Sequence, residues 1–280
     1  AHPLLRSVHT KNIPVWSEIE LGYREIKQLP IIAITGTNGK TTTTTLMGEI
    51  LKAAGKTPFV GGNIGLPLCD LPFLPEKFDV IVLELSSFQL ESIVTFKPTI
   101  GMLLNIYPNH GERYDTIEDY ARAKFHLADR MSKEDLIIYG KEFPFVDSWA
   151  EGLITKTTAI SAHNKSALTA QFPTFDFPSI KLPGFHNWVN TAFCLRAAEY
   201  LMLDMKAVQR AIASFTGVDH RICPVPTKIN TVKVFNDAKS TNWDATLKAL
   251  ESVQDQGKRI YLILGGQKRG RGDSIKDFLA

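Results

Sequence analysis

Residues 31–42 read IIAITGTNGKTT, and this stretch decides the fold. Its first part, Ile31–Thr35, is apolar and rich in β-branched residues, which predicts a short buried strand. A glycine-rich turn follows, and Thr41–Ala54 then has the character of a helix that Gly55 closes. The order of strand, glycine-rich loop and helix is typical of a phosphate-binding loop.

The loop carries glycine, lysine and threonine in the order that phosphate binding needs. Backbone N–H groups at the helix start and the ammonium of Lys40 would hold the β- and γ-phosphates, and the Thr41 hydroxyl would bind magnesium. The general pattern has a glycine where Ile34 stands, so this loop is a variant. The alternative, a glycine-rich turn that binds nothing, does not explain why strand, Lys-Thr pair and helix coincide. The residues predicted to bind nucleotide here are Gly36, Thr37, Asn38, Gly39, Lys40, Thr41 and Thr42.

Apolar runs and helical segments continue to alternate along the chain. Phe78–Leu83 and Thr99–Leu104 contain few polar residues, as expected for strands of a parallel sheet covered on both faces. Ile117–Met131 is predicted to be a helix, Leu136–Tyr139 a strand, and 143–182 a series of short β-like runs with turns. Two further helices are predicted at Trp188–Leu203 and Lys206–Phe215. The predicted fold class is therefore α/β, with a mostly parallel central sheet flanked by helices.

After Gly217 the pattern begins again. It predicts a strand at Val232–Phe235, a helix at Trp243–Val253 and a strand at Arg259–Leu264. This order is that of a βαβ unit, so we expect the beginning of a second, Rossmann-like α/β domain. The predicted domains are 30–217 and 218–280, preceded by a linker, 1–29.

The composition is that of a globular protein with a full core. Of 280 residues, 44% are hydrophobic and 22% charged, and the formal net charge of +3 gives no argument for nucleic acid. The cysteines, Cys69, Cys194 and Cys223, are odd in number and lack metal-ligand spacing, which fits buried thiols in a reducing compartment. No stretch reaches the roughly 20 apolar residues of a membrane span. We expect a cytoplasmic, monomeric protein that binds neither nucleic acid nor membrane.

Three side chains outside the loop are candidates for chemistry. Glu84 follows an apolar run and would emerge at the carboxyl end of a central strand, where ligand sites gather in such sheets. It could hold magnesium or only cap the next turn. His110 lies in another loop after a strand, where a histidine is more often a surface residue than a ligand. Lys124 comes shortly after Ala121 and Ala123 on a helix predicted to pack on the sheet, so its ammonium needs a partner or must extend to solvent.

Several motifs together resemble the Mur ligases of peptidoglycan synthesis, over nearly the whole chain. They are GTNGKTT at 36–42, ELSSFQLE at 84–91, NH at 109–110, YARAK at 120–124, LPGFHN at 182–187 with Asn190, HR at 220–221, NDAKSTN at 236–242 and GG at 265–266. The runs at 84–91 and at 62–67, GNIGLP, resemble in particular the family member that adds D-glutamate.

This resemblance implies a reaction and its cofactors. The protein would be an ATP-dependent amide ligase that joins D-glutamate to UDP-N-acetylmuramoyl-L-alanine through an acyl phosphate. It would use ATP and two Mg²⁺ ions, and Lys124 would be carbamylated by carbon dioxide, which turns a buried cation into an anionic magnesium ligand.

The resemblance also implies residue roles. Catalysis would involve Lys40, Lys124 and His110, and the metal ligands would be Thr41, Glu84, His110 and Lys124. The nucleotide would also contact Asn187, Asn190, Arg221, Asp237 and Lys239. Asn63 and Ser86 would contact the UDP-muramoyl substrate, and Thr241 and Lys268 the incoming amino acid.

The family has three domains, so the resemblance implies that this chain is cut at both ends. Residues 1–29 would follow a missing uridine-binding domain, and 218–280 would begin the third domain. We therefore expect this stretch to bind ATP but to ligate poorly or not at all.

The sequence departs from the family pattern at two places, and three rival functions are not excluded by the sequence. Glu112 stands where the family usually has aspartate, and the run 265–270 is unusually basic. The rivals are a Mur ligase with another acceptor, a folylpolyglutamate-type ligase, and a phosphate-loop module that binds nucleotide without ligation.

Overall fold

A computed structural model of the protein describes residues 8, 10–11, 13–26, 29–141, 144–229, 231–240, 243–254 and 259–265. Its centre is a six-stranded sheet with the strand order β2-β3-β1-β4-β5-β6, and every pairing in it is parallel. The strands are β1 (Ile31–Thr35), β2 (Pro58–Gly62), β3 (Val80–Glu84), β4 (Ile100–Leu103), β5 (Leu136–Lys141) and β6 (Lys156–Ser161).

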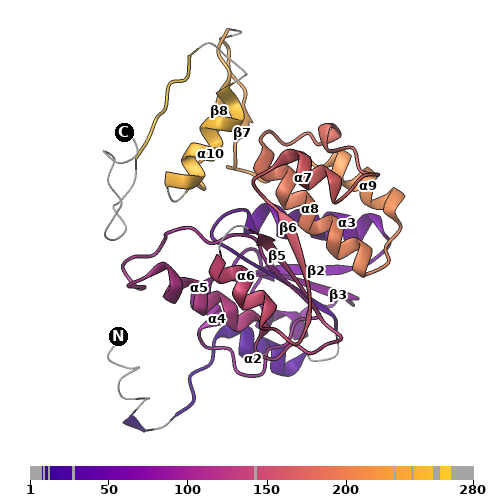
Figure 1. Cartoon of the computed structure of the whole chain (residues 1–280), viewed down its shortest axis with the longest axis vertical. Coiled ribbons are helices and arrows are strands. Elements are labelled where there is room, and N and C mark those ends of the chain that lie inside the picture. Colours follow the sequence, from indigo (N-terminus) through magenta and orange to yellow (C-terminus); the bar gives the residue numbers. More distant parts are fainter. Residues whose placement is uncertain are drawn as a thin grey trace.

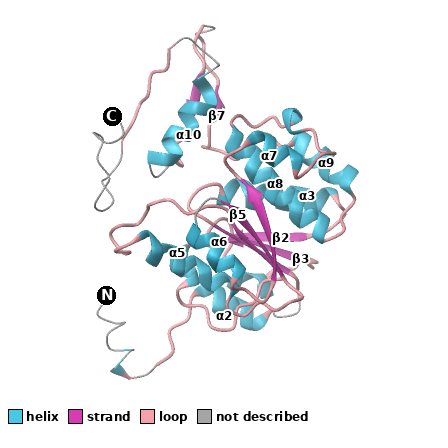
Figure 2. Ribbon diagram, viewed as in Figure 1, coloured by secondary structure: helices cyan, strands magenta, loops and turns pink. Residues whose placement is uncertain are grey.

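Helices cover both faces of this sheet (Figures 1 and 2). One face packs on α3 (Lys40–Ala53), α7 (Lys165–Ala170), α8 (Phe185–Tyr200) and α9 (Met205–Ser214). The other packs on α2 (Glu18–Glu25), α5 (Ile117–Phe125) and α6 (Pro144–Glu151), with α4 (Ser87–Leu90) at the sheet edge. Short 3₁₀ turns lie at η1 (Leu68–Phe73), η2 (His126–Ala128) and η3 (Phe177–Ser179).

The central strand β1 shows why the sequence forms this layered structure. All five of its residues are buried, and successive side chains of a strand point to opposite faces. Ile32 and Ile34 therefore enter the core formed with α3 and α8, whereas Ile31 and Ala33 enter the core formed with α2 and α5. A strand buried on both faces is expected to be mainly apolar, and four of these five residues are, with Thr35 as the polar residue at the end.

The segment expected to be a linker contains a helix that packs into the domain. Within 1–29, Ser17 caps α2 by accepting a hydrogen bond from the backbone N–H of Glu20 at 3.3 Å. Ile19 and Glu20 are fully buried. The Glu20 carboxylate accepts backbone hydrogen bonds from Val94, Thr95 and Phe96 at 2.8, 2.8 and 3.1 Å.

Three secondary-structure predictions were incomplete. The β-like signals in 143–182 conceal two helices, α6 and α7, with β6 as the one strand there in the described residues. The helix predicted to reach Met131 ends at Phe125 and continues as a 3₁₀ turn. The edge strand β2 was missed, because Pro58 and two glycines give it a weak strand pattern.

The C-terminal part is small and lies at one end of the molecule (Figure 1). It contains β7 (Cys223–Val225), β8 (Val234–Asn236) and α10 (Trp243–Val253), and β7 pairs with β8 in an antiparallel manner. The strand predicted at Arg259–Leu264 is wrong, since these residues form no ladder and Ile263 is 98% exposed. A strand is stable only where a neighbour takes its backbone hydrogen bonds, and the described residues provide none here.

None of the helices in the described residues combines the length and the apolar character that crossing a bilayer requires.

Candidate functional site

The glycine-rich loop connects β1 to α3 at the carboxyl edge of the sheet. Gly36 and Gly39 both have positive φ, 149° and 85°. A Cβ atom on Gly39 would lie 2.5 Å from the Asn190 side-chain oxygen, so only glycine fits where α8 meets the loop. The loop therefore presents the N-terminus of α3, which begins at Lys40, to the open edge of the sheet.

Asn105, which the sequence analysis did not single out, holds the loop in shape. Its Oδ1 accepts hydrogen bonds from the backbone N–H groups of Thr37 and Asn38 at 3.1 and 2.8 Å. Its Nδ2 donates to the Asn38 carbonyl at 3.1 Å. Asn105 comes shortly after the end of β4, so it shares with Glu84 the position at a strand's carboxyl end that predicts a ligand site.

Lys40 is folded back onto its own loop. Its ammonium donates to the carbonyl oxygens of Gly36 and Thr37 at 3.0 and 2.9 Å. Burial lowers the pKa of Lys40, and the nearby Glu84 carboxylate partly opposes this effect. A cation held in this way is available to a phosphate group that reaches the loop.

Glu84 ends β3 next to this loop and is 3% exposed. Its Oε1 accepts a hydrogen bond from the Asn63 side chain at 2.9 Å, and its Oε2 has no hydrogen-bond partner in the described part of the chain. A buried carboxylate oxygen without a partner is costly in a structural role and well suited to a cation. The oxygen donors of Glu84 and Thr41 thus fit magnesium, a hard ion.

Lys124 is 1% exposed and lies on the far side of β1 from α3. Its ammonium donates to the Thr35 hydroxyl at 3.4 Å and lies 4.6 Å from the centre of the Tyr120 ring. Burial, followed by repulsion from Lys40, lowers the pKa of Lys124 well below its usual value. The structure thus shows a buried lysine and not one that extends to solvent.

His110 is joined to Lys124 through the ring of Tyr120. The His110 ring lies 4.8 Å from Phe88 and 6.0 Å from Tyr120 between centres. Its Nδ1 is 3.0 Å from a carboxylate oxygen of Glu112. Within the described residues, no group of three or more His, Cys, Asp and Glu side chains is arranged to hold a metal, so a magnesium site here would also need hydroxyl, phosphate or modified-lysine oxygens.

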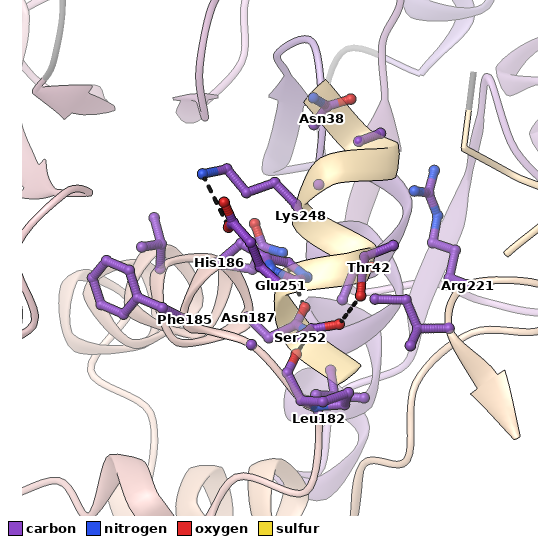
Figure 3. Close-up of a pocket in the computed structure, with 18 of the residues that line it drawn as sticks. Asn38, Thr42, Leu182, Phe185, His186, Asn187, Arg221, Lys248, Glu251 and Ser252 are labelled. Carbon is purple, nitrogen blue, oxygen red and sulfur yellow. Dashed lines mark hydrogen bonds and ion pairs between the residues drawn. The ribbon is translucent and has the colours of Figure 1, made fainter. Parts of the chain in front are cut away.

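A cavity of about 630 Å³ opens beside the loop. Its walls come from the loop (Asn38), from the first turn of α3 (Thr42), from α8 (His186, Asn187) and from the C-terminal part, including Arg221, Lys248 and Ser252 (Figure 3). Asn190 also lines it, and its Nδ2 donates to Asn187 Oδ1 at 3.3 Å. The cavity thus combines polar side chains from segments that are far apart in the sequence.

Arg221 and Asp237, both from the C-terminal part, are among the charged residues that line this cavity. Arg221 donates to the Thr41 hydroxyl at 3.3 Å, and Asp237 accepts from the backbone N–H of Ile222 at 3.1 Å. Burial lowers the pKa of His186 to about 4, and the positive charges of Lys248 and Arg221 add to this effect. Above that pH His186 is a neutral ring that lines the cavity.

The other residues predicted to contact substrate or nucleotide lie at several separate positions. Asn63 contacts Glu84, and Ser86 caps α4 in a capping box with Gln89. Lys239 is exposed and donates its backbone N–H to the His220 carbonyl at 3.2 Å. Thr241 and Lys268 lie outside the described residues.

Taken together, a parallel sheet, a glycine-rich loop at its carboxyl edge and a lysine at the following helix define an α/β protein of the phosphate-loop class. The model of the Mur ligase middle domain matches residues 34–198. The chain therefore belongs to the Mur ligase family.

Relatives and solved structures agree with this assignment. The chain is 36% identical over 294 residues to the UDP-N-acetylmuramoylalanine–D-glutamate ligase of Alkaliphilus metalliredigens (strain QYMF), covering 99% of this chain and 62% of that protein. It is 35% identical to the ligase of the same name from Streptococcus suis (strain 98HAH33), covering 96% and 61%. The chain thus spans about 60% of the length of these relatives.

Among solved structures, MurF from Acinetobacter baumannii superposes with a TM-score of 0.68 at 17% identity, covering 85% of this chain and 57% of that one. MurC from Thermotoga maritima superposes with a TM-score of 0.59 at 21% identity, covering 90% and 60%. At this level of identity the likeness concerns the fold, and it confirms the α/β fold class with a mostly parallel sheet.

Proposed function

We propose that this chain provides the ATP-binding part of a ligase that joins D-glutamate to UDP-N-acetylmuramoyl-L-alanine. The observation that carries the proposal is the grouping of Lys40, Thr41 and the unpartnered carboxylate oxygen of Glu84 at one edge of the sheet. The relatives named for this reaction support the choice of substrates.

An amide bond from a carboxylate and an amine needs an activated acyl group. In the proposed reaction a carboxylate oxygen of the muramoyl-L-alanine attacks the γ-phosphorus of ATP, and the bond to the β,γ-bridging oxygen breaks, releasing ADP. The D-glutamate amine then attacks the acyl carbon, loses a proton and expels inorganic phosphate. Both anions must first be brought together, so positive charge and hydrogen-bond donors are the main requirement.

The residues of this chain meet that requirement in separate ways. The loop N–H groups and Lys40 would bind the phosphates. Asn187, Asn190, Arg221 and Asp237 would line the nucleotide cavity. Magnesium would be held by Thr41, Glu84, His110 and modified Lys124, and it would neutralise charge on the phosphates.

Carbamylation of Lys124 is part of this proposal. The buried amine has a lowered pKa, so its neutral form is available to attack the carbon of CO₂, lose one proton and become an N-carboxylate. The product replaces a costly buried cation with an anion beside Lys40. We expect activity to fall when CO₂ and bicarbonate are removed and to return with bicarbonate. Activity unaffected by thorough removal would contradict the modification.

The decisive experiment measures phosphate release by the full-length protein with ATP, Mg²⁺ and UDP-N-acetylmuramoyl-L-alanine. D-glutamate is compared with L-glutamate, L-lysine and meso-diaminopimelate. Phosphate release that depends on D-glutamate supports the proposal. Release that depends on another amino acid means a ligase with a different acceptor substrate. Nucleotide binding without phosphate release favours a module without ligase activity.

Lys40→Ala should lower kcat by about 10²- to 10³-fold, because a donor aimed at transition-state charge is lost. Lys52→Ala is the matched control, since Lys52 lies on the same helix with 57% of its side chain exposed. If the kcat of Lys40→Ala lay within about fivefold of the kcat of Lys52→Ala, the proposed role of Lys40 would be contradicted.

We further propose that the protein works as a monomer in the cytoplasm. The three cysteines are free thiols, which is the usual state in a reducing compartment. Cys194 is buried as predicted, whereas Cys69 and Cys223 are partly exposed.

A further inference from the structure

The turn that carries His110 is held in an unusual backbone conformation. His110 has a φ of 55°, a value that non-glycine residues seldom adopt. The backbone N–H groups of Arg113 and Tyr114 both donate to the His110 carbonyl, at 2.9 and 3.0 Å. The backbone of His110, from which its ring projects, is therefore held by the two residues that close this turn.

Glu91 binds both of those residues at once. Its carboxylate accepts from Arg113 Nε at 3.0 Å and also from Arg113 Nη2, which makes a two-point ion pair. The same carboxylate accepts a hydrogen bond from the Tyr114 hydroxyl. The Arg113 hydrogen bond lowers the pKa of Glu91, so the carboxylate stays charged at neutral pH.

The ring of Phe88 completes the contact between α4 and the turn. It lies 4.8 Å from the His110 ring, and the Tyr114 ring is stacked on it at 6.1 Å with an interplanar angle of 8°. Arg113 lies over the same ring at 5.2 Å. Because α4 spans only four residues, Ser87–Leu90, it has little stability of its own, and these contacts fix it and the turn to each other.

We propose that Glu91 is a positioning residue of the ligase, which acts through Arg113 and Tyr114 to set the place of His110. The inference rests on the proposed function, in which His110 helps to hold magnesium. Groups hydrogen-bonded directly to a metal-binding histidine commonly affect activity by about 10- to 100-fold. Glu112 makes that direct contact with His110, and Glu91 acts one step further away, through Arg113 and Tyr114, so we expect its effect at the lower end of this range. An ordinary surface ion pair would have no such effect, because such pairs contribute little.

The kinetic test is a double-mutant cycle in the full-length protein. Glu91→Gln keeps the shape of the side chain and removes its charge, and it should lower kcat by about tenfold and raise the Mg²⁺ concentration needed for half-maximal rate. Arg113→Lys should behave alike, since lysine cannot make the two-point contact. In a His110→Ala background, Glu91→Gln should change kcat by less than about twofold. Equal losses in both backgrounds would overturn the proposal.

The matched control is Glu199→Gln, which removes a carboxylate from another Arg–Glu pair, at 2.6 Å from Arg196 on α8. It should leave kcat and the Mg²⁺ requirement unchanged. If Glu199→Gln lowered kcat as much as Glu91→Gln does, the effect would be one of general stability and the proposal would fail.

A second measurement does not depend on activity. The rate at which diethyl pyrocarbonate modifies His110 is followed by mass spectrometry of its peptide, with His163 and His220 as internal references. Glu91→Gln should speed modification of His110 several-fold and leave the references unchanged. An unchanged His110 rate would overturn the positioning role. If the wild-type protein does not ligate, the proposed function fails, and this measurement still decides whether Glu91 places His110.

Discussion

At the scale of the residue, Glu20 shows how one buried carboxylate joins distant segments. It is fully buried, yet it accepts hydrogen bonds from the backbone of 94–96, from the Thr95 hydroxyl at 2.6 Å and from Arg24 at 2.8 Å. Burial alone would raise the pKa of Glu20, but the hydrogen bonds from Thr95 and Val94 prevail and lower it to about 2. The charged form is thus specifically stabilised in the folded protein.

This shift predicts a pH-dependent stability. The folded-state pKa lies below the unfolded value of 4.5, so the folded state binds fewer protons, and the stabilisation is present above pH 4.5 and lost as the pH falls toward 2. Glu20→Gln should lower the free energy of unfolding by about 1–3 kcal/mol at pH 7. Urea unfolding of the wild type and of Glu20→Gln at pH 7 and pH 3 measures this effect. If the two proteins differed in unfolding free energy by the same amount at both pH values, the prediction would be contradicted. Glu25→Gln, at an exposed position on α2, is the control.

At the scale of the element, α3 has a glycine with positive φ at each end. Gly39, before its first turn, has a φ of 85°, and Gly55, after its last, has a φ of 79°. A Cβ on Gly39 would collide with Asn190, whereas a Cβ on Gly55 would meet nothing within 4 Å. A residue with a side chain would therefore be strained by the backbone at both positions, but it would meet a neighbouring atom only at position 39.

Alanine substitutions at Gly39 and Gly55 should therefore have similar effects on stability and different effects on ATP binding. Alanine at either position costs about 1–2 kcal/mol of unfolding free energy from the left-handed backbone. Gly39→Ala should in addition abolish measurable ATP binding, because the loop must move away from Asn190. Gly55→Ala should keep the wild-type Kd. Calorimetric titration with Mg·ATP and thermal unfolding of both variants measure these effects, and wild-type affinity in Gly39→Ala would contradict the proposed phosphate loop.

At the scale of the whole molecule, the cavity is shared between the sheet domain and the C-terminal part. Arg221 contacts Thr41 across this division, and the residues on either side of it, His220 and Ile222, both have positive φ, 63° and 49°. Isoleucine rarely adopts such a φ, so the segment is held in a strained conformation. Burial lowers the pKa of Arg221, and Glu84 and Asp237 oppose this effect.

From this arrangement we predict that Arg221→Ala weakens ATP binding by about 10- to 100-fold, since one charge-assisted contact to phosphate is worth about 1.5–3 kcal/mol. Arg210→Ala, at an exposed position of α9, should have no effect. The Kd from titration with Mg·ATP is the measurement. If Arg221→Ala bound ATP as tightly as Arg210→Ala, the C-terminal part would not belong to the nucleotide site.

The sequence by itself determined the central strands β1, β3, β4 and β5, the helix after the glycine-rich loop, and the position of the phosphate-loop lysine. The apolar run Ile31–Thr35 is a strand with those bounds, and the helix predicted at Thr41–Ala54 spans Lys40–Ala53, one residue earlier at each end. Glu84 lies at a strand end as expected. These features follow from local rules, since side-chain periodicity and glycine placement act within a few residues of the chain.

Only the tertiary structure decided which segments meet. It placed β1 between β3 and β4, brought Asn105 to the phosphate loop and buried Glu20 against 94–96. Among the residues that the structure describes, it gave 259–264 no strand partner. The physical reason is that a buried polar group or a strand edge needs a partner from a distant part of the chain, and that partner is fixed by the packing of the whole domain, not by the local pattern.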